Sequence, residues 1–338
     1  MKSRRECEKI LGKSLLTRVE TRLKMKKINQ MTIDRVLDYL ALHQEAFPFF
    51  DIDALSDNLC ESLKESITFH NISTSVKYLF KEHAYGFARN GKVFINTKPL
   101  KLVLPNDKYN VMVDSLIRHE LDHVATTRVM KLDKPTFKKI VARNIRANKE
   151  LFGQEVVPEG ERLEDYINKV ATTQFACVII ENGKKTPVQA DRIILTRCGV
   201  RGSHGDNKVF HFMGSMPLNE GITAYKMKIM DKFAGQGGLM CQSGYILGEE
   251  VAGHIARTIG KEEFIARQIA GDFVGIAERY KEITGKTPKQ MRRLFHILDT
   301  KGYKSFLDKL LSQMDYSNKN QMNKKTQEEY DEIVGPVR

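Results

Sequence analysis

The sequence predicts an α+β protein with a small β-sheet, one helix directly after it, and a mostly helical C-terminal lobe. Residues 76–96 hold short β-branched and aromatic runs around an Asn-Gly turn, and residues 111–127 have apolar positions at helical spacing. Most of residues 218–314 follow the same helical period. The 338 residues can bury a substantial core, and 41% hydrophobic with 29% charged residues is ordinary for a globular protein.

The first 50 residues are expected to form a basic helical segment. Residues 1–30 carry ten Lys or Arg against three Glu. Amphipathic helices are expected over residues 32–43 and 51–66, and Asp51 is a residue type that often caps a helix N-terminus. His43 has no acidic or histidine partner nearby in sequence, so we expect an ordinary core or surface histidine.

The net charge of +13 allows a nucleic-acid or other anionic partner. Part of it lies in residues 1–30 and in residues 131–150, which carry seven Lys or Arg against two acidic residues. Neither segment interleaves aromatic and basic residues as a base-stacking surface does. Nucleic acid is therefore a possible partner, but solvated helix faces are favoured.

Neither a membrane partner nor export by an ordinary signal peptide is expected. No apolar run approaches the roughly 18 residues that a membrane span needs, and the N-terminus lacks an apolar signal core. The five cysteines are scattered without a Cys-x-x-Cys pair, which favours reduced thiols. These features predict a cytoplasmic protein.

Residues 51–130 are expected to form one lobe that contains the sheet. A strand is expected over residues 76–80, and residues 85–96 are typical of a hairpin because Asn90-Gly91 favours a type I′ turn. The edge of the strand that precedes the next helix is expected to be exposed. Such an edge can pair with an extended peptide.

The helix expected over residues 111–127 contains the pattern His-Glu-x-x-His. Residues four apart share a helix face, so His119 and His123 can both point at one metal ion. Glu120 is offset by one position, so its carboxylate can reach a metal-bound water without being a ligand. A purely structural helix is the alternative, but it would leave these polar groups near an apolar face, where buried polar groups need partners.

Residues 131–217 are expected to form an insertion folded outside the site. The Gly-rich residues 199–206 are expected to form a loop, and no Gly-Lys-Ser/Thr follows that would make it a phosphate-binding loop. The other expected elements are helices over residues 135–149 and 159–172 and strands over residues 174–181 and 189–195.

Residues 218–314 are expected to form the helical C-terminal lobe, followed by a polar tail over residues 315–338. A helix begins near Pro217 and carries Glu220, with Gly221 allowing close backbone approach. The later helices are expected over residues 245–258, 261–269, 273–283, 288–298 and 303–313.

A catalytic zinc site needs three protein ligands and an open position. The metzincin extension requires Gly at position 126 and His at position 129, where this chain has Thr126 and Val129, so that class is excluded. His119–His123 together with Asn219-Glu220 resembles the gluzincin-type zinc metallopeptidases. The resemblance covers about residues 76–130 and 217–285, and similar bacterial proteins carry the same pair of motifs.

This resemblance implies a zincin-like fold and one catalytic Zn²⁺ held by His119, His123 and Glu220. It also implies hydrolysis of a peptide or protein substrate, with Glu120 as general base. Thermolysin-like members have an Asp four residues after the ligand Glu. This chain has Ala224 there, so Thr223 or Asn219 is expected to hydrogen-bond a zinc histidine instead.

Gluzincins generally take an oxyanion-stabilising Tyr or His from the downstream half of the chain. Tyr245 is the first choice here, ahead of His204, His211 and Tyr225, while His254 is expected to be structural. Two other functions stay open from the sequence. One is a zincin-fold binding protein without activity, and the other is a mobile-element protein whose basic N-terminal arm binds nucleic acid.

Overall fold

The computed structural model describes most of the chain as an α+β, mostly helical protein. The described residues are 1–70, 86–89, 91–97, 106–130, 133–154, 156–171, 177–181, 184–188, 190, 192–196, 199–204, 207–235 and 246–301. They divide into two compact units, Met1–Thr126 with Thr223–Ser243, and Thr127–Ile222 with Gly244–Arg338. Among these residues no helix has the length and apolar character to cross a membrane.

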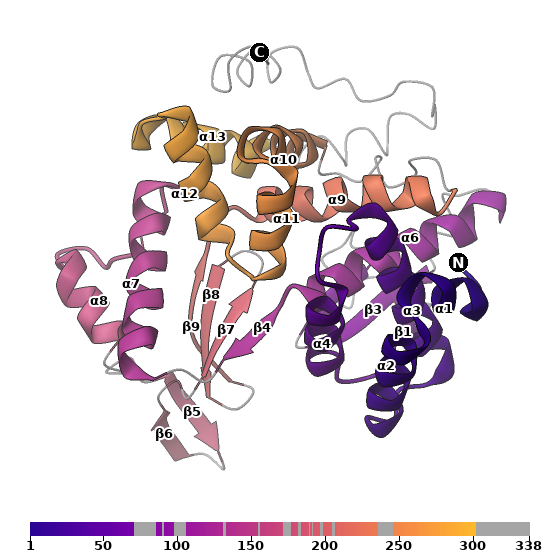
Figure 1. Ribbon diagram of the computed structural model, residues 1–338. Coiled ribbons are helices and arrows are strands. Elements are labelled where there is room, and N and C mark those ends of the chain that lie inside the picture. The colour runs from indigo at the N-terminus through magenta and orange to yellow at the C-terminus, as the bar shows by residue number, and fades with distance from the viewer. Residues whose placement is uncertain are drawn as a thin grey trace. The chain divides into compact units, whose positions relative to one another are not determined.

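Four helices begin unit 1 (Figure 1): α1 (Arg4–Leu11), α2 (Lys13–Met25), α3 (Gln30–Ala46) and α4 (Ile52–Ser62). Each expected helix in this part of the chain is confirmed, although α4 ends four residues early. Side chains cap three of them. Ser3 forms a capping box with Glu6, the Asn29 side chain accepts from Thr32 N, and Asp51 accepts from the first amides of α4.

Part of the basic charge of residues 1–30 is paired inside unit 1. Arg18 and Arg22 of α2 form ion pairs with Asp53 and Asp57 of α4. Lys26 Nζ donates to three carbonyl oxygens at the C-terminal end of α4, at 2.6, 2.7 and 3.0 Å, where a positive charge complements the helix dipole. These basic side chains therefore hold α2 against α4.

A three-stranded sheet follows, with β1 (Thr68–His70), β2 (Gly86–Arg89) and β3 (Lys92–Asn96) in the order β1-β3-β2. The hairpin is confirmed, because β2 and β3 are antiparallel and Gly91 at the turn has a φ of 76°. The expectation that the strand before the metal-binding helix is an edge is wrong, because β1 pairs in parallel with β3 on its other side. Among the described strands, β1 and β2 are the edges. The strand expected over residues 76–80 lies outside the described residues.

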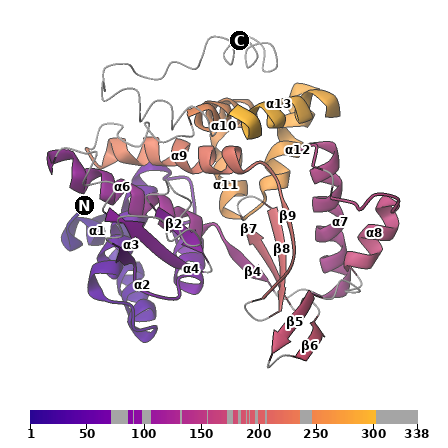
Figure 2. The same cartoon turned by 180° about the vertical axis from the view of Figure 1, so that it is seen from behind.

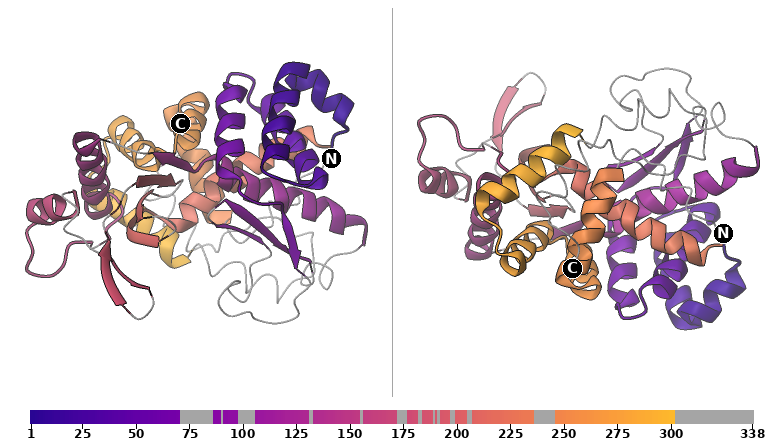
Figure 3. Two further views of the ribbon diagram at one scale, coloured as in Figure 1. Left: turned by 90° about the horizontal axis from the view of Figure 1, so that it is seen from below. Right: turned by 90° about the horizontal axis from the view of Figure 1, so that it is seen from above.

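The helix with the His-Glu-x-x-His pattern is confirmed as α6 (Asn106–Ala125). The sheet packs against it through β2 and β3 (Figure 3). The inward side chains of β3, Val93 and Ile95, are fully buried. The expected helix near Pro217 is α9 (Met216–Phe233), and its residues 223–233 run alongside α6 within unit 1 (Figure 2).

Unit 2 contains a four-stranded antiparallel sheet in the order β4-β7-β8-β9, a β5-β6 hairpin and two helices that form a core with the sheet. Phe137 and Val141 of α7 and Ile167 of α8 pack in this core with Ile193 of β7 and Val200 of β8. The bounds are β4 (Arg128–Met130), α7 (Lys134–Glu150), α8 (Leu163–Ala171), β5 (Cys177–Glu181), β6 (Lys184–Val188), β7 (Arg192–Thr196), β8 (Gly199–His204) and β9 (Asn207–Met213).

The loop expected over residues 199–206 is a wrong prediction, because Gly199–His204 is the inner strand β8. It pairs with β7 on one side and β9 on the other, and Val200 is fully buried. Glycines weaken an isolated strand, but pairing on both edges and burial outweigh that preference.

The remaining described helices of unit 2 are α10 (Ile246–Ile259), α11 (Lys261–Ile269), α12 (Phe273–Thr284) and α13 (Pro288–Lys301), which confirms the four helices expected over residues 245–298. Gly221 lies against Gly248 of α10. A Cβ at Gly221 would come within 2.1 Å of the Gly248 carbonyl carbon, so the predicted close backbone approach is confirmed. The helix expected over residues 303–313 and the polar tail lie outside the described residues.

Candidate metal centre

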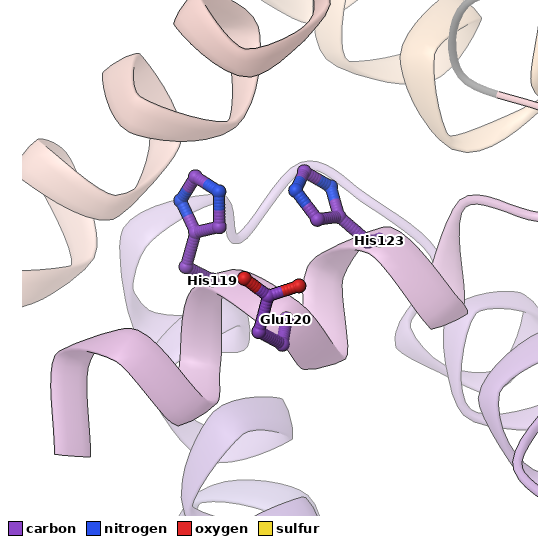
Figure 4. A group of neighbouring side chains, drawn as sticks. All are labelled: His119, Glu120 and His123. Carbon is purple, nitrogen blue, oxygen red and sulfur yellow. The ribbon is translucent and has the colours of Figure 1, made fainter. Parts of the chain in front are cut away.

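His119, Glu120 and His123 come together on α6 (Figure 4). One potential ligand atom from each lies within 4.8 Å of the other two. The imidazole rings lie edge to face with their centroids 4.5 Å apart. The three side chains are exposed by only 4%, 4% and 5%. Imidazole nitrogens and carboxylate oxygens are donors that zinc binds in proteins, so this group is able to hold a metal ion.

Glu120 lies on the side of α6 that faces the sheet. A Cβ built on Gly86 of β2 would lie 3.3 Å from Glu120 Cγ, 3.2 Å from Ile95 Cδ1 and 3.2 Å from Phe94 O. The absence of a side chain at Gly86 therefore lets the β2 backbone pass close to the Glu120 side chain.

Thr223 of α9 contacts the second histidine. Its Oγ1 lies 3.3 Å from His123 Nδ1, and both groups are buried. This is one of the two hydrogen bonds expected from the sequence. A hydrogen bond at Nδ1 orients the ring and makes Nε2 the nitrogen that remains for a metal.

A buried ion pair lies next to this contact. Lys226 Nζ donates to Asp122 Oδ1 at 2.5 Å, and Tyr39 of α3 donates to the same oxygen at 2.8 Å. The Asp122 and Lys226 side chains are both 0% exposed. Burial lowers the pKa of Lys226, and the Asp122 carboxylate opposes that shift.

A second buried cluster surrounds Arg118 of α6. Its guanidinium donates to Asp231 of α9 at 2.9 Å and to Asp38 of α3 at 3.2 Å, while Ser115 donates to Asp231 at 2.8 Å. Burial raises the pKa of Asp231, and Arg118, Ser115 and the nearby His119 oppose this shift. The cluster therefore extends electrostatically to the first histidine.

Several buried charged side chains lie close to the histidines. The two clusters hold the carboxylates of Asp38, Asp122 and Asp231 and the cationic side chains of Arg118 and Lys226. Glu120 is buried as well. A divalent cation held by His119 and His123 would interact favourably with the Glu120 carboxylate.

Of the other predicted site residues, Glu220 is half-buried in the part of α9 that belongs to unit 2, and Asn219 is buried there too. Tyr245 lies outside the described residues, as do the side chains of His204 and His211.

Two further histidines were expected to be structural. His43 is a core histidine, fully buried with its ring near Phe47 and Phe50, and burial lowers its pKa well below the ordinary value. His254 packs on Tyr280 within unit 2, and burial lowers its pKa to about 4.

Sequence reasoning missed the polar residues that surround the candidate ligands. Asp122 and Arg118 carry no signal beyond charge on a helix face that also holds apolar residues. Lys226 gives a weak signal, because it stands between Ile222 and Met230 at positions that a buried helix face would fill with apolar side chains.

Comparisons of the chain with models of protein families, with curated proteins and with solved structures found no match. What the protein does is therefore inferred from the side chains that α6 and α9 bring together.

Proposed function

We propose that the protein is a zinc-dependent metallopeptidase. The observation that carries this proposal is the buried group of His119, Glu120 and His123, with Thr223 contacting the Nδ1 atom of His123. A structural helix has no need of two imidazoles and a carboxylate converging in the interior.

Glu220 is the proposed third ligand. It precedes Thr223 by three positions on the same continuous helix α9, so the two side chains leave that helix on one face. Within unit 1, Thr223 contacts His123, the second of the two proposed histidine ligands. Glu220 is assigned as the third ligand from the resemblance of Asn219-Glu220 to the gluzincin motif.

In this proposal Glu120, Thr223 and Tyr245 each have a separate role in hydrolysis. Bound zinc would polarise the substrate carbonyl and lower the pKa of a water to roughly 7. Glu120 accepts a proton from the attacking water at its carboxylate and then donates it to the leaving amine nitrogen. Thr223 keeps His123 in one ring orientation. Tyr245 remains the proposed oxyanion donor on sequence grounds alone.

The zincin-like fold and the peptide substrate belong to the same proposal. The edge strand β2 passes beside Glu120 and, among the described strands, has β3 on only one side. An extended peptide that adds to this edge by backbone hydrogen bonds would bring its scissile bond close to the base. This geometry supports a peptide or protein as the substrate class.

Replacing Gly86 with alanine is expected to lower turnover without loss of zinc. The new Cβ would lie 3.2–3.3 Å from its neighbours, which is tight enough to displace the Glu120 side chain by a few tenths of an ångström. Because a misplacement of about 1 Å can cost on the order of 10²-fold in rate, we expect kcat to fall about tenfold. Steady-state kinetics with zinc content measured on the same sample check this, and an unchanged kcat would show that β2 does not position Glu120.

The proposed function is tested by degradation of a mixed peptide library, followed by mass spectrometry. The wild-type protein is expected to cleave peptides, to stop after treatment with a zinc chelator, and to recover when Zn²⁺ is restored. Cleavage that continues after complete metal removal would contradict the proposal. So would a zinc-loaded protein that leaves every peptide in a broad library intact.

A further inference from the structure

Three polar contacts connect α9 to α6 inside unit 1, in order along both helices. Thr223 meets His123, Lys226 meets Asp122, and Asp231 meets Arg118 together with Ser115. The first and second contacts are one helical turn apart on α9, while their partners are adjacent on α6. Of the described ion pairs between the two helices, Lys226–Asp122 therefore lies nearest in sequence to the candidate ligand His123.

A second buried ion pair, Arg118–Asp231, also joins the two helices, but it lies further from His123 along α6 than Lys226–Asp122 does. Met227 of α9, directly after Lys226, and Met230, one turn beyond it, are fully buried, and methionine side chains are flexible and tolerate alternative packing. A slip of one helical turn would move Thr223 by about 5.4 Å and remove it from His123. Such a slip would also separate two buried charges, which is strongly unfavourable. Buried polar pairs that fix helix register are known from coiled coils.

We propose that Lys226, through its ion pair with Asp122, is a positioning residue of the metal centre that fixes the register of α9 against α6. This inference rests on the proposed zinc site, because the register decides whether Thr223 meets His123. Lys226 itself touches neither the metal ligands nor, in this assignment, the substrate.

Tyr39 provides a matched comparison within the same cluster. It donates to the same Asp122 oxygen as Lys226, but from α3 instead of α9. Tyr39→Phe therefore weakens the support of Asp122 and leaves the α9–α6 ion pair in place. If Lys226 only stabilises a buried carboxylate, substitutions at Lys226 and at Tyr39 should change the zinc affinity equally. If Lys226 fixes the position of α9, only substitution of Lys226 should lower the zinc affinity.

The experiment measures Zn²⁺ affinity by competition with a chelating dye in the full-length protein. Lys226→Met alone leaves Asp122 charged in the interior, so Asp122→Asn/Lys226→Met is made as well to remove both charges. We expect the double variant to fold and its zinc Kd to rise about 10–100-fold, as for loss of other groups that orient metal ligands. The zinc Kd of Tyr39→Phe is expected to stay at the wild-type value.

A second readout needs no metal. The ¹⁵N chemical shift of His123 Nδ1 in the metal-free protein, assigned with His123→Gln, reports its hydrogen bond. The Thr223→Val variant gives the His123 Nδ1 chemical shift that results when this hydrogen bond is lost. We expect the chemical shift of the double variant to lie closer to that of Thr223→Val, and the chemical shift of Tyr39→Phe to equal that of the wild type. If wild-type protein binds no zinc, the proposed function fails, and this shift still decides whether Lys226 fixes the register.

Two results would overturn the proposal. The first is a double variant that keeps both the wild-type zinc Kd and the wild-type His123 shift, which would make the ion pair dispensable for position. The second is an equal effect of Tyr39→Phe and Lys226→Met on both readouts, which would assign Lys226 to general stability.

Discussion

Replacing Glu120 with glutamine is expected to reduce peptide hydrolysis by about 10²–10⁴-fold while zinc content stays at the wild-type level, because a positioned general base contributes about that factor. Glutamine has nearly the same shape as glutamate, so the packing beside Gly86 is retained. It cannot accept a proton from water at neutral pH. The chemical step should therefore fail while His119 and His123 still bind metal.

Asp114→Asn is the control for this variant. Asp114 lies on α6 as well, but it pairs with Arg35 of α3 and takes no part in the metal-capable group. Its replacement is expected to leave hydrolysis and zinc content as in the wild type. Wild-type turnover in Glu120→Gln, measured on samples with equal zinc, would remove Glu120 as the base.

Replacing Glu220 with alanine is expected to weaken zinc binding by more than the about 10–100-fold that loss of an outer hydrogen bond causes, because a direct ligand disappears. The two histidines on α6 remain, and two protein ligands are fewer than a catalytic zinc site normally has. Hydrolysis should disappear together with the metal. Competition with a chelating dye measures the change in Kd.

Glu250→Ala provides the comparison for the Glu220 variant. Glu250 is a partly exposed carboxylate on α10, the helix that packs against Gly221 through Gly248. Its loss changes the charge of the same region by the same amount and should leave zinc affinity unaltered. A Glu220→Ala protein with wild-type zinc affinity would exclude Glu220 as a ligand and direct the search to another third donor.

Most helices could be predicted from local signals in the sequence. Asp51 is a cap in the structure as its residue type suggested, and Asn90-Gly91 correctly predicted the hairpin. The prediction that the strand before α6 is an edge strand was wrong for a physical reason. Strand β1 (Thr68–His70) is short and pairs in parallel with β3, more than twenty residues later in the sequence. Local sequence patterns do not specify such a pairing. The strand Gly199–His204 was missed for a related reason, since its pairing with two neighbours outweighs its glycines.

Only the part of the candidate site that lies on one helix could be predicted from residue spacing. His119, Glu120 and His123 follow from the helical period. Thr223 was one of two candidates for the contact with a histidine, and in the structure it lies beside His123. The Lys226–Asp122 pair joins residues 104 positions apart, so its partners are determined by the packing of α9 on α6 and by no local pattern.

Zinc content per chain, measured by elemental analysis after dialysis into metal-free buffer, tests the proposed metal centre most directly. The wild-type protein is predicted to retain one zinc ion per chain, and His119→Ala/His123→Ala is predicted to retain none. A wild-type protein without zinc after reconstitution, or a double variant that keeps as much zinc as the wild type, would contradict a zinc site on α6.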